Sequence, residues 1–85
     1  MNDYYFTFRS ITTAQTGSAT LHDAGLRHVL LRTPKAMARQ GCGYSLRVTA
    51  AQAALAAQCL RQAGASYQRI YQQAAPGDAP VEVVL

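Results

Sequence analysis

The sequence predicts an α+β fold: a ferredoxin-like split βαβ sandwich of order βαββαβ, with a four-stranded antiparallel sheet and both helices on one face. Eighty-five residues allow one hydrophobic core, and a composition of 49% hydrophobic and 14% charged residues supplies it. Two strand-like segments each lead through a threonine into a helical pattern that ends on Ala-Gly. The chain therefore contains two similar halves, for which this sandwich, with strand order 4-1-3-2, is the most economical arrangement.

The first half predicts two strands around one helix. Residues 4–9 are rich in aromatic side chains and alternate between two faces, which is typical of a strand. Thr12, followed three residues later by glutamine, forms a capping-box pattern for a helix that stops at Gly25. Residues 28–32 predict the second strand, and Pro34 ends it because proline disfavours helix in the residue before it.

The second half repeats this order. Residues 44–48 predict the third strand, Thr49 begins a second capping box, and residues 67–71 predict the fourth strand. The helix between them is rich in alanine, ends at Gly64, and is expected to turn inward Leu55, Cys59, Leu60 and Ala63. We expect one domain over residues 1–72, followed by a C-terminal tail over 73–85 that is either mobile or an added edge strand.

Charge is distributed unevenly along the chain. No acidic residue occurs between Ala24 and Gly77, and the same stretch carries seven cations: Arg27, Arg32, Lys35, Arg39, Arg47, Arg61 and Arg69. A segment of this kind attracts anions, which include nucleic acid, acidic protein surfaces, small oxyanions and a thiolate of the protein itself. A solvated basic surface without a ligand is the alternative.

Several functional classes find no support in the sequence. Four acids, three of them near the ends of the chain, disfavour paired-carboxylate catalysis, and no glycine-rich nucleotide loop is present. His22 and His28 lack the spacing that seeds a zinc site, so neither a metal nor another cofactor is predicted. No apolar run is long enough to span a membrane and no signal-peptide pattern occurs, so we expect a cytoplasmic protein.

Cys42 is the leading candidate for a reactive group. It lies between Gly41 and Gly43 at the end of a connector too long for a tight hairpin. The predicted topology surrounds it with Arg9, Ser10, Lys35, Arg39, Arg47 and a helix N-terminus at Thr12 and Thr13. Cations and a helix N-terminus both favour the thiolate, which is the nucleophilic form of cysteine. The alternative is that Gly-Cys-Gly is only a turn.

The second cysteine has a different setting. Cys59 follows Leu55 at helical spacing, which favours a core position in which cysteine acts as a small apolar residue. The sequence leaves open whether Cys59 pairs with Cys42, because pairing depends on the separation of the two Cα atoms.

A binding surface is the competing hypothesis. The sheet face away from the helices is expected to show tyrosines interleaved with arginines: Tyr5, Thr7, Arg9, His28, Leu30, Arg32, Ser45, Arg47, Tyr67, Arg69 and Tyr71. Aromatic rings stack on bases and arginines bind phosphates, so such a face suits RNA. The same face could bind another protein or be buried in a homodimer.

The whole pattern resembles a small family of bacterial proteins described as selenium/sulfur carrier-like. The likeness covers about residues 4–72 and rests on Tyr5-x-x-Phe8-x-Ser10, Ala14, Ala24-Gly25, Pro34, Cys42-Gly43-x-x-Leu46-Arg47 and Ala63-Gly64. It implies a carrier rather than an enzyme, whose cysteine holds sulfur or selenium as a persulfide or perselenide between donor and acceptor proteins. The anionic cargo would be stabilised by Arg39, Arg47 and the helix N-terminus formed by Ser10, Thr12 and Thr13, and the flanking glycines would admit the partner proteins.

Overall fold

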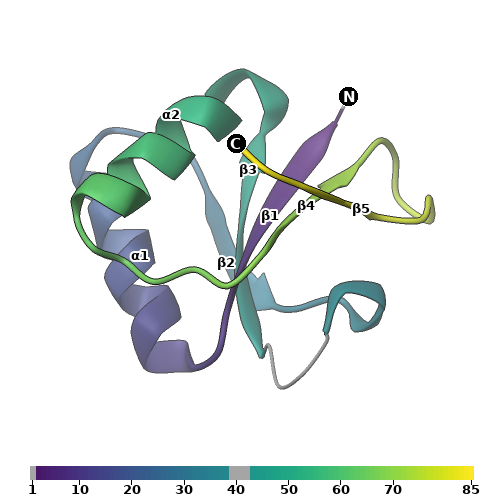
Figure 1. The fold of residues 1–85 in the computed structure, drawn as a ribbon, viewed down its shortest axis with the longest axis horizontal. Coiled ribbons are helices and arrows are strands. Elements are labelled where there is room, and N and C mark those ends of the chain that lie inside the picture. The colour runs from purple at the N-terminus through teal and green to yellow at the C-terminus, as the bar shows by residue number, and fades with distance from the viewer. Residues whose placement is uncertain (1, 39–42) are drawn as a thin grey trace.

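The computed structural model describes residues 2–38 and 43–85 and shows an antiparallel sheet with two helices against one face (Figure 1). In chain order the elements are β1 (Asp3–Phe8), α1 (Ile11–Asp23), β2 (Val29–Arg32), the 3-10 helix η1 (Lys35–Met37), β3 (Tyr44–Thr49), α2 (Ala50–Gln62), β4 (Ile70–Gln73) and β5 (Val81–Val83). The order across the sheet is β2-β3-β1-β4-β5. The α+β class is confirmed, and none of the described helices is long and apolar enough to cross a membrane.

The sheet of the described chain has five strands, so the expectation of four is wrong. The additional strand, β5, comes from the tail and pairs antiparallel with β4, with Tyr71 opposite Glu82. Gly77 has a φ of 90°, a conformation that favours glycine, in the segment that reverses the chain between the two strands. The tail therefore covers an edge of β4 that would otherwise present unpaired backbone groups.

Helix α1 begins two residues earlier than the sequence pattern predicts. Ser10 is the N-cap, and its Oγ accepts a hydrogen bond from the backbone N–H of Thr13 at 3.2 Å. The Thr13 Oγ1 in return accepts one from the backbone N–H of Ser10 at 3.3 Å. The capping box expected at Thr12 is therefore wrong, because the chain leaves β1 at Phe8 and turns into the helix at once. The predicted stop is confirmed, since Gly25 has a φ of 74°.

Helix α2 begins after Thr49 and ends before Gly64, as predicted, but a different face is buried. Thr49 is the N-cap but makes no side-chain capping bond, so the capping box predicted there is wrong. The predicted inward face is wrong at Leu55, which is 51% exposed, and at Ala63, which is exposed as well. The buried residues of α2 are mainly alanines: Ala53, Ala56, Ala57 and Leu60. Small side chains let the helix approach the sheet closely, so the large apolar side chains of the core come from the strands.

The main core fills the space between the sheet and the helices. Phe6 and Phe8 of β1 and Leu46 of β3 are fully buried there, together with Leu21 of α1. A Cβ atom added at Gly17 of α1 would lie 2.8 Å from Cζ of Phe8. The glycine that makes α1 a weak helix by intrinsic propensity is therefore the residue that admits the Phe8 ring.

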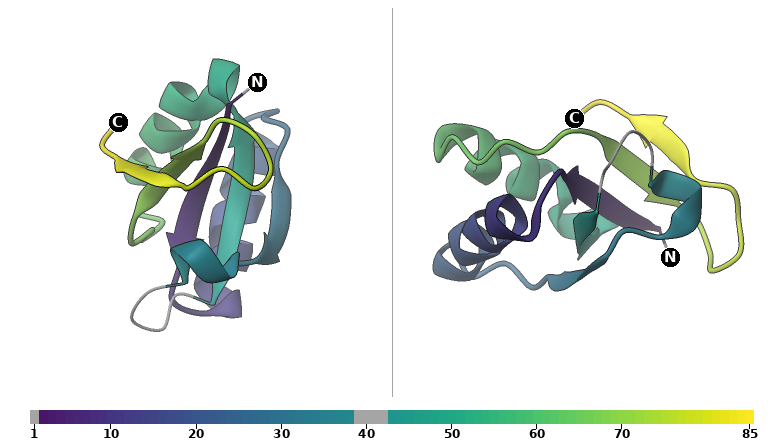
Figure 2. Two further views of the ribbon diagram at one scale, coloured as in Figure 1. Left: turned by 90° about the vertical axis from the view of Figure 1, so that its right-hand side faces the viewer. Right: turned by 90° about the horizontal axis from the view of Figure 1, so that it is seen from below.

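The opposite face of the sheet is partly covered. In Figure 2, η1 and the two helices lie on opposite sides of the sheet. Met37 of η1 is fully buried against Tyr5 and Tyr71, with Leu31 packed beside them, in a second and smaller cluster. The expectation that this face presents Tyr5 and Tyr71 to solvent is wrong, because the connector after β2 folds back across it.

Several residues expected on that face lie on the helix side instead. Leu30 packs against the main core, and the His28 Nε2 lies 2.6 Å from the hydroxyl of Ser18 on α1. The Tyr67 ring meets the ring of Phe6 edge-on, with 5.2 Å between their centroids. In β2 it is Leu31 rather than Leu30 that faces away from the helices, because successive residues of a strand point to opposite sides and a shift of one exchanges the faces.

Candidate functional site

Three strands meet at Gly43. Its backbone N–H donates to the carbonyl of Phe8 at the end of β1, at 3.1 Å, and its carbonyl accepts from the N–H of Thr33, just after β2, at 3.0 Å. The prediction that the end of the first strand lies beside the start of the third is confirmed, since Phe8 is paired with Tyr44. Cys42, Gly41 and Arg39 lie outside the described residues, and Gly43 is the first described residue after them.

The N-terminus of α1 lies at this end of the sheet, directly after β1. The hydroxyls of Ser10 and Thr13 are both engaged in capping, because the Thr13 Oγ1 also donates to the Ser10 carbonyl at 3.0 Å. Thr12 is exposed on the first turn. The side chains of Ser10 and Thr13 therefore complete the helix, and what this terminus offers an anion is its partial positive charge.

Cations surround this end of the sheet and are held in place. With the Gln68 amide oriented so that its oxygen faces Arg9, that oxygen accepts from the Arg9 Nε and Nη2 at 3.1 Å each. The Arg32 guanidinium lies 5.4 Å from the centre of the Tyr44 ring and donates to the Tyr44 hydroxyl at 3.3 Å. Cation–π contact and these hydrogen bonds orient the cations without neutralising them.

The acids of the described chain lie mostly at the other end. Asp3 starts β1, Asp23 ends α1, and Asp78 follows β4, so all three are remote from Gly43. Glu82 is used internally, because its carboxylate forms an ion pair with Arg69 at 3.1 Å. The end of the sheet that carries Gly43 therefore has a net positive charge from Arg9, Arg32 and Lys35, whose side chain is exposed.

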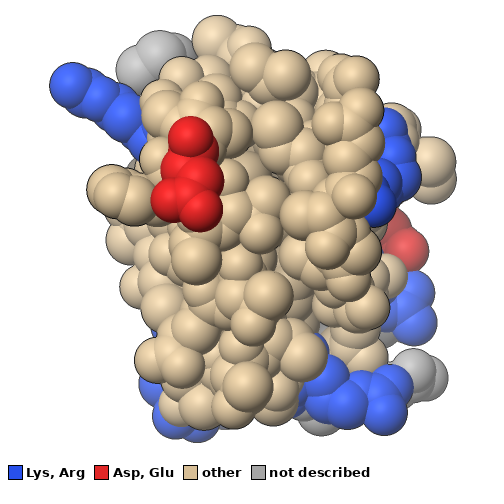
Figure 3. Space-filling view, turned by 90° about the vertical axis from the view of Figure 1, so that its left-hand side faces the viewer, with Lys and Arg blue, Asp and Glu red and all other residues tan. Residues whose placement is uncertain are grey.

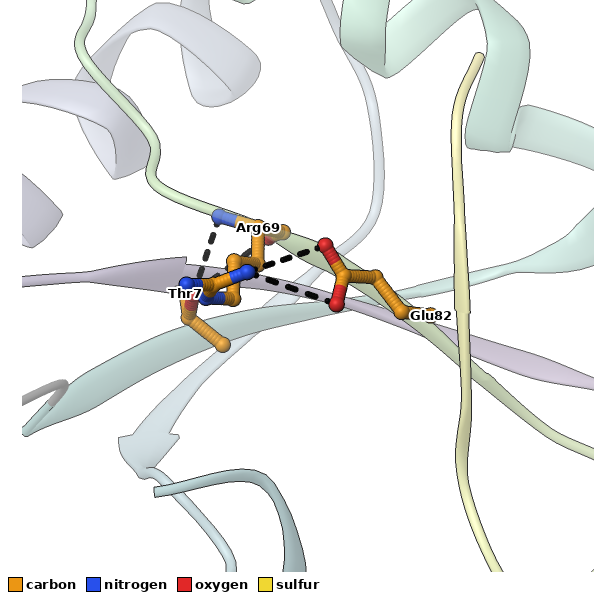
Figure 4. A network of polar contacts seen from close by, with 3 residues as sticks. All are labelled: Thr7, Arg69 and Glu82. Atoms are coloured by element: carbon orange, nitrogen blue, oxygen red, sulfur yellow. Dashed lines mark hydrogen bonds and ion pairs between the residues drawn. The ribbon is translucent and has the colours of Figure 1, made fainter. Parts of the chain in front are cut away.

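Arg69 is tied into the sheet by more than this ion pair. Figure 4 shows its side chain against Glu82 and its backbone against Thr7. The Arg69 N–H donates to the Thr7 Oγ1 at 3.1 Å, and that hydroxyl donates to the Arg69 carbonyl at 3.3 Å. With Tyr5 and Tyr71 only 5% and 3% exposed, this face offers neither stacking rings nor an uncommitted Arg69 to RNA.

Arg47 is not brought to the same end. It lies opposite Tyr5 and Val29 in the middle of the sheet, four residues along β3 from Gly43, which is roughly 13 Å of strand. It lines a hollow with Asp3 and Arg27. Of the predicted cargo-binding residues that the structure describes, it therefore places Ser10, Thr12, Thr13 and Gly43 together and Arg47 apart.

The helix side of the molecule has a different character. Figure 3 shows it as a mostly uncharged surface that carries one group of acidic atoms, with Lys and Arg side chains at its rim. Cys59 of α2 is partly buried and packs against the main core, so the core interpretation of this residue is confirmed. The His28 ring contacts the Leu26 carbonyl as well as Ser18, so both of its nitrogens are occupied.

Sequence reasoning missed two supports of this site. Gln68 and Tyr44 hold the arginines at the end of the sheet, and neither was assigned a role. Both contacts follow from the pairing of the chain: Arg32 and Tyr44 are Cα partners across β2 and β3, and Gln68 lies beside β1 through its N–H bond of 2.7 Å to the Thr7 carbonyl. The sequence could not have identified them, because the connector between β2 and β3 is too long to fix their register or the side of β2 on which Arg32 lies.

The fold defines a small α+β protein whose sheet has one basic end. Gly43, the residue that follows Cys42 in the sequence, lies at that end. A family model described as "Putative Se/S carrier protein-like" matches residues 3–72, which is most of the chain. The chain belongs to this family, as the sequence resemblance indicated. No curated protein and no solved structure matches it.

Proposed function

We propose that this protein carries sulfur or selenium on Cys42. The observation that supports this best is the family match combined with the position of Gly43, the residue after Cys42, among the ends of three strands and beside a helix N-terminus. A family of carriers needs a group that accepts cargo and releases it unchanged. A thiol in a basic setting meets that need without further catalytic residues.

The proposed loading step is a sulfur transfer between cysteines. The Cys42 thiolate attacks the terminal sulfur of a cysteine persulfide on the donor protein. A new S–S bond forms to Cys42, the S–S bond of the donor breaks, and the donor cysteine leaves as a thiolate. The number of disulfide-type bonds is unchanged, so no external oxidant or reductant is needed. Delivery is the same exchange with an acceptor thiolate, and selenium takes the place of the terminal sulfur in a perselenide.

Electrostatics support the anionic forms on this pathway. Arg9, Arg32 and Lys35 raise the positive potential at this end, and the α1 N-terminus adds to it. Arg39, three positions before Cys42 in the sequence, adds a further cation to this segment, whereas Arg47 contributes less because of its distance along β3. Gly41 and Gly43 carry no side chains beside the sulfur, so donor and acceptor proteins with acidic rims can approach it closely.

Cysteine variants test this proposal directly. We expect wild-type protein and the Cys59→Ser variant to gain the mass of one sulfur atom on treatment with glutathione persulfide, and the Cys42→Ser variant to gain none. Peptide mass spectrometry locates the added sulfur, and thermal unfolding shows whether each variant is folded. Equal loading of folded Cys42→Ser, or loading confined to Cys59, would overturn the proposal.

A further inference from the structure

A second basic site, a surface hollow lined by two arginines, lies at the opposite end of the sheet. It is a shallow hollow of about 400 Å³ between the start of β2 and the end of β3, and its lining includes Asp3, Arg27, Val29, Arg47, Val48 and Thr49. Thr49 is six residues along β3 from Gly43, which is roughly 20 Å of strand. The hollow is therefore separate from the place proposed for the carrier cysteine.

Its two arginines are not neutralised by ion pairs. In the part of the chain that the structure describes, the ion pair within 4.0 Å is that of Arg69 with Glu82, and neither Arg27 nor Arg47 has such a partner. Arg47 is half-buried and Arg27 is exposed. An arginine that is partly removed from water without a partner gains from binding an oxyanion, to which it donates in a fixed, two-pronged geometry.

The end of β3 adds a hydroxyl to the arginines. Thr49 is exposed and is the N-cap of α2, yet its side chain makes no capping bond, so its Oγ1 is available to a ligand. His28 also lines the hollow, but it has no ring nitrogen left to bind a ligand, because its two nitrogens contact the Ser18 hydroxyl and the Leu26 carbonyl. Val29, which is 45% exposed, supplies an accessible apolar side chain to the lining, whereas Val48 is buried in the main core.

Asp3 sets a limit on the charge of the hollow. Its carboxylate lines the same space and opposes an anion, so two cations act against one acid. The register places Asp3 opposite Thr49, diagonal to Arg47 rather than directly across from it. The remaining positive charge and the exposed Val29 side chain favour a ligand with one anionic head and an apolar body over a polyanion such as RNA.

From this geometry we infer that the hollow binds a small organic anion, with its carboxylate or phosphate group on Arg27, Arg47 and Thr49 and its apolar part against Val29. The volume suits a small metabolite, since it lies near the lower end of the range for ligand sites. This inference does not depend on the proposed carrier function, and the experiment below tests it separately.

The test is an NMR titration of the full chain at constant ionic strength, with inorganic phosphate, phenyl phosphate and benzoate as probes. We expect saturable shifts of the amides at 27–29 and 47–51, and severalfold tighter binding of an aromatic anion than of phosphate, because the ring removes apolar surface from water. Comparison of phenyl phosphate with benzoate identifies the preferred head group.

Charge variants separate a built site from general attraction. Arg27→Gln and Arg47→Gln should each weaken binding about tenfold, the loss of one charge-assisted contact. Lys35→Gln removes the same charge elsewhere and should change affinity less than about twofold. Asp3→Asn should tighten binding, and Asp78→Asn, its matched control, should not. Shifts spread over all cationic residues, or equal effects of Lys35→Gln and Arg47→Gln in folded protein, would overturn the inference.

Discussion

Replacing Gly17 with alanine tests how the main core positions β1, the strand that ends at the candidate site. The added Cβ would lie 2.8 Å from Cζ of Phe8, 3.1 Å from Cδ1 of Leu46 and 3.2 Å from Cε2 of Phe8. Carbon atoms in contact are ordinarily about 3.5–4.0 Å apart, so the Phe8 ring must move by more than half an ångström. Phe8 is fully buried, which leaves it no free space to move into.

Two opposing contributions determine the size of the effect. Alanine is favoured over glycine inside a helix by about 1 kcal/mol. Overpacking a close-packed core costs about 1–3 kcal/mol. We therefore expect Gly17→Ala to lower the free energy of unfolding by about 1 kcal/mol, although the same change stabilises most helices. In a chain of this size that corresponds to a decrease in Tm of roughly 4–8 °C.

Urea denaturation followed by circular dichroism measures this quantity. Ala19→Gly, at an exposed position of the same helix, gives the propensity contribution alone and should cost about 1 kcal/mol. The double variant Gly17→Ala with Phe8→Leu should be more stable than the sum of the single effects predicts, because the shorter side chain makes room for the Cβ. A stabilised Gly17→Ala protein, or strictly additive effects, would refute this account of the core.

Three further predictions concern the elements around the candidate site. Met37→Ala should cost about 2 kcal/mol, at the low end for a buried methionine because a surface connector can partly collapse, and should increase solvent quenching of tyrosine fluorescence; unchanged stability would show that η1 does not seal the second cluster. Ser10→Ala should cost about 1 kcal/mol and Thr12→Ala only a few tenths, as measured by thermal unfolding, since Ser10 is the N-cap; the reverse order would restore the sequence-based assignment. The rate of alkylation of Cys42 by iodoacetamide, measured against pH, should have its midpoint below about pH 8.5, which is the pKa of an ordinary free cysteine. A midpoint at or above that pH would contradict a thiolate-stabilising setting.

The sequence determined the parts of this protein that depend on local chemistry. Glycine tolerates a positive φ at low cost, so Gly25 and Gly64 identified the ends of both helices before the fold was known. The two halves, each a strand followed by a helix, established the α+β class and the neighbouring positions of β1 and β3. The hypothesis that Cys42 is the reactive group also comes from the sequence, because glycine on both sides of a cysteine in a basic segment is a local pattern.

Tertiary structure decided which side of each element is buried. Leu30 and Leu31 have the same intrinsic preference, and only pairing with β3 decides that Leu30 faces the helices and Leu31 the Met37 cluster. Leu55 of α2 is exposed for a related reason, since the strands already fill the core and the helix approaches through alanines.

The surroundings of the candidate site also depended on long-range contacts. Gln68 meets Arg9 across 59 positions of sequence. Tyr5 and Tyr71, which were expected to bind RNA, are covered by Met37 of η1, and no strand or helix pattern in the sequence was strong enough to place that segment. Local sequence specifies φ and ψ preferences and the chemistry of a side chain. Which side chains meet is determined by the packing of the whole chain, because each contact forms only where the others leave room for it.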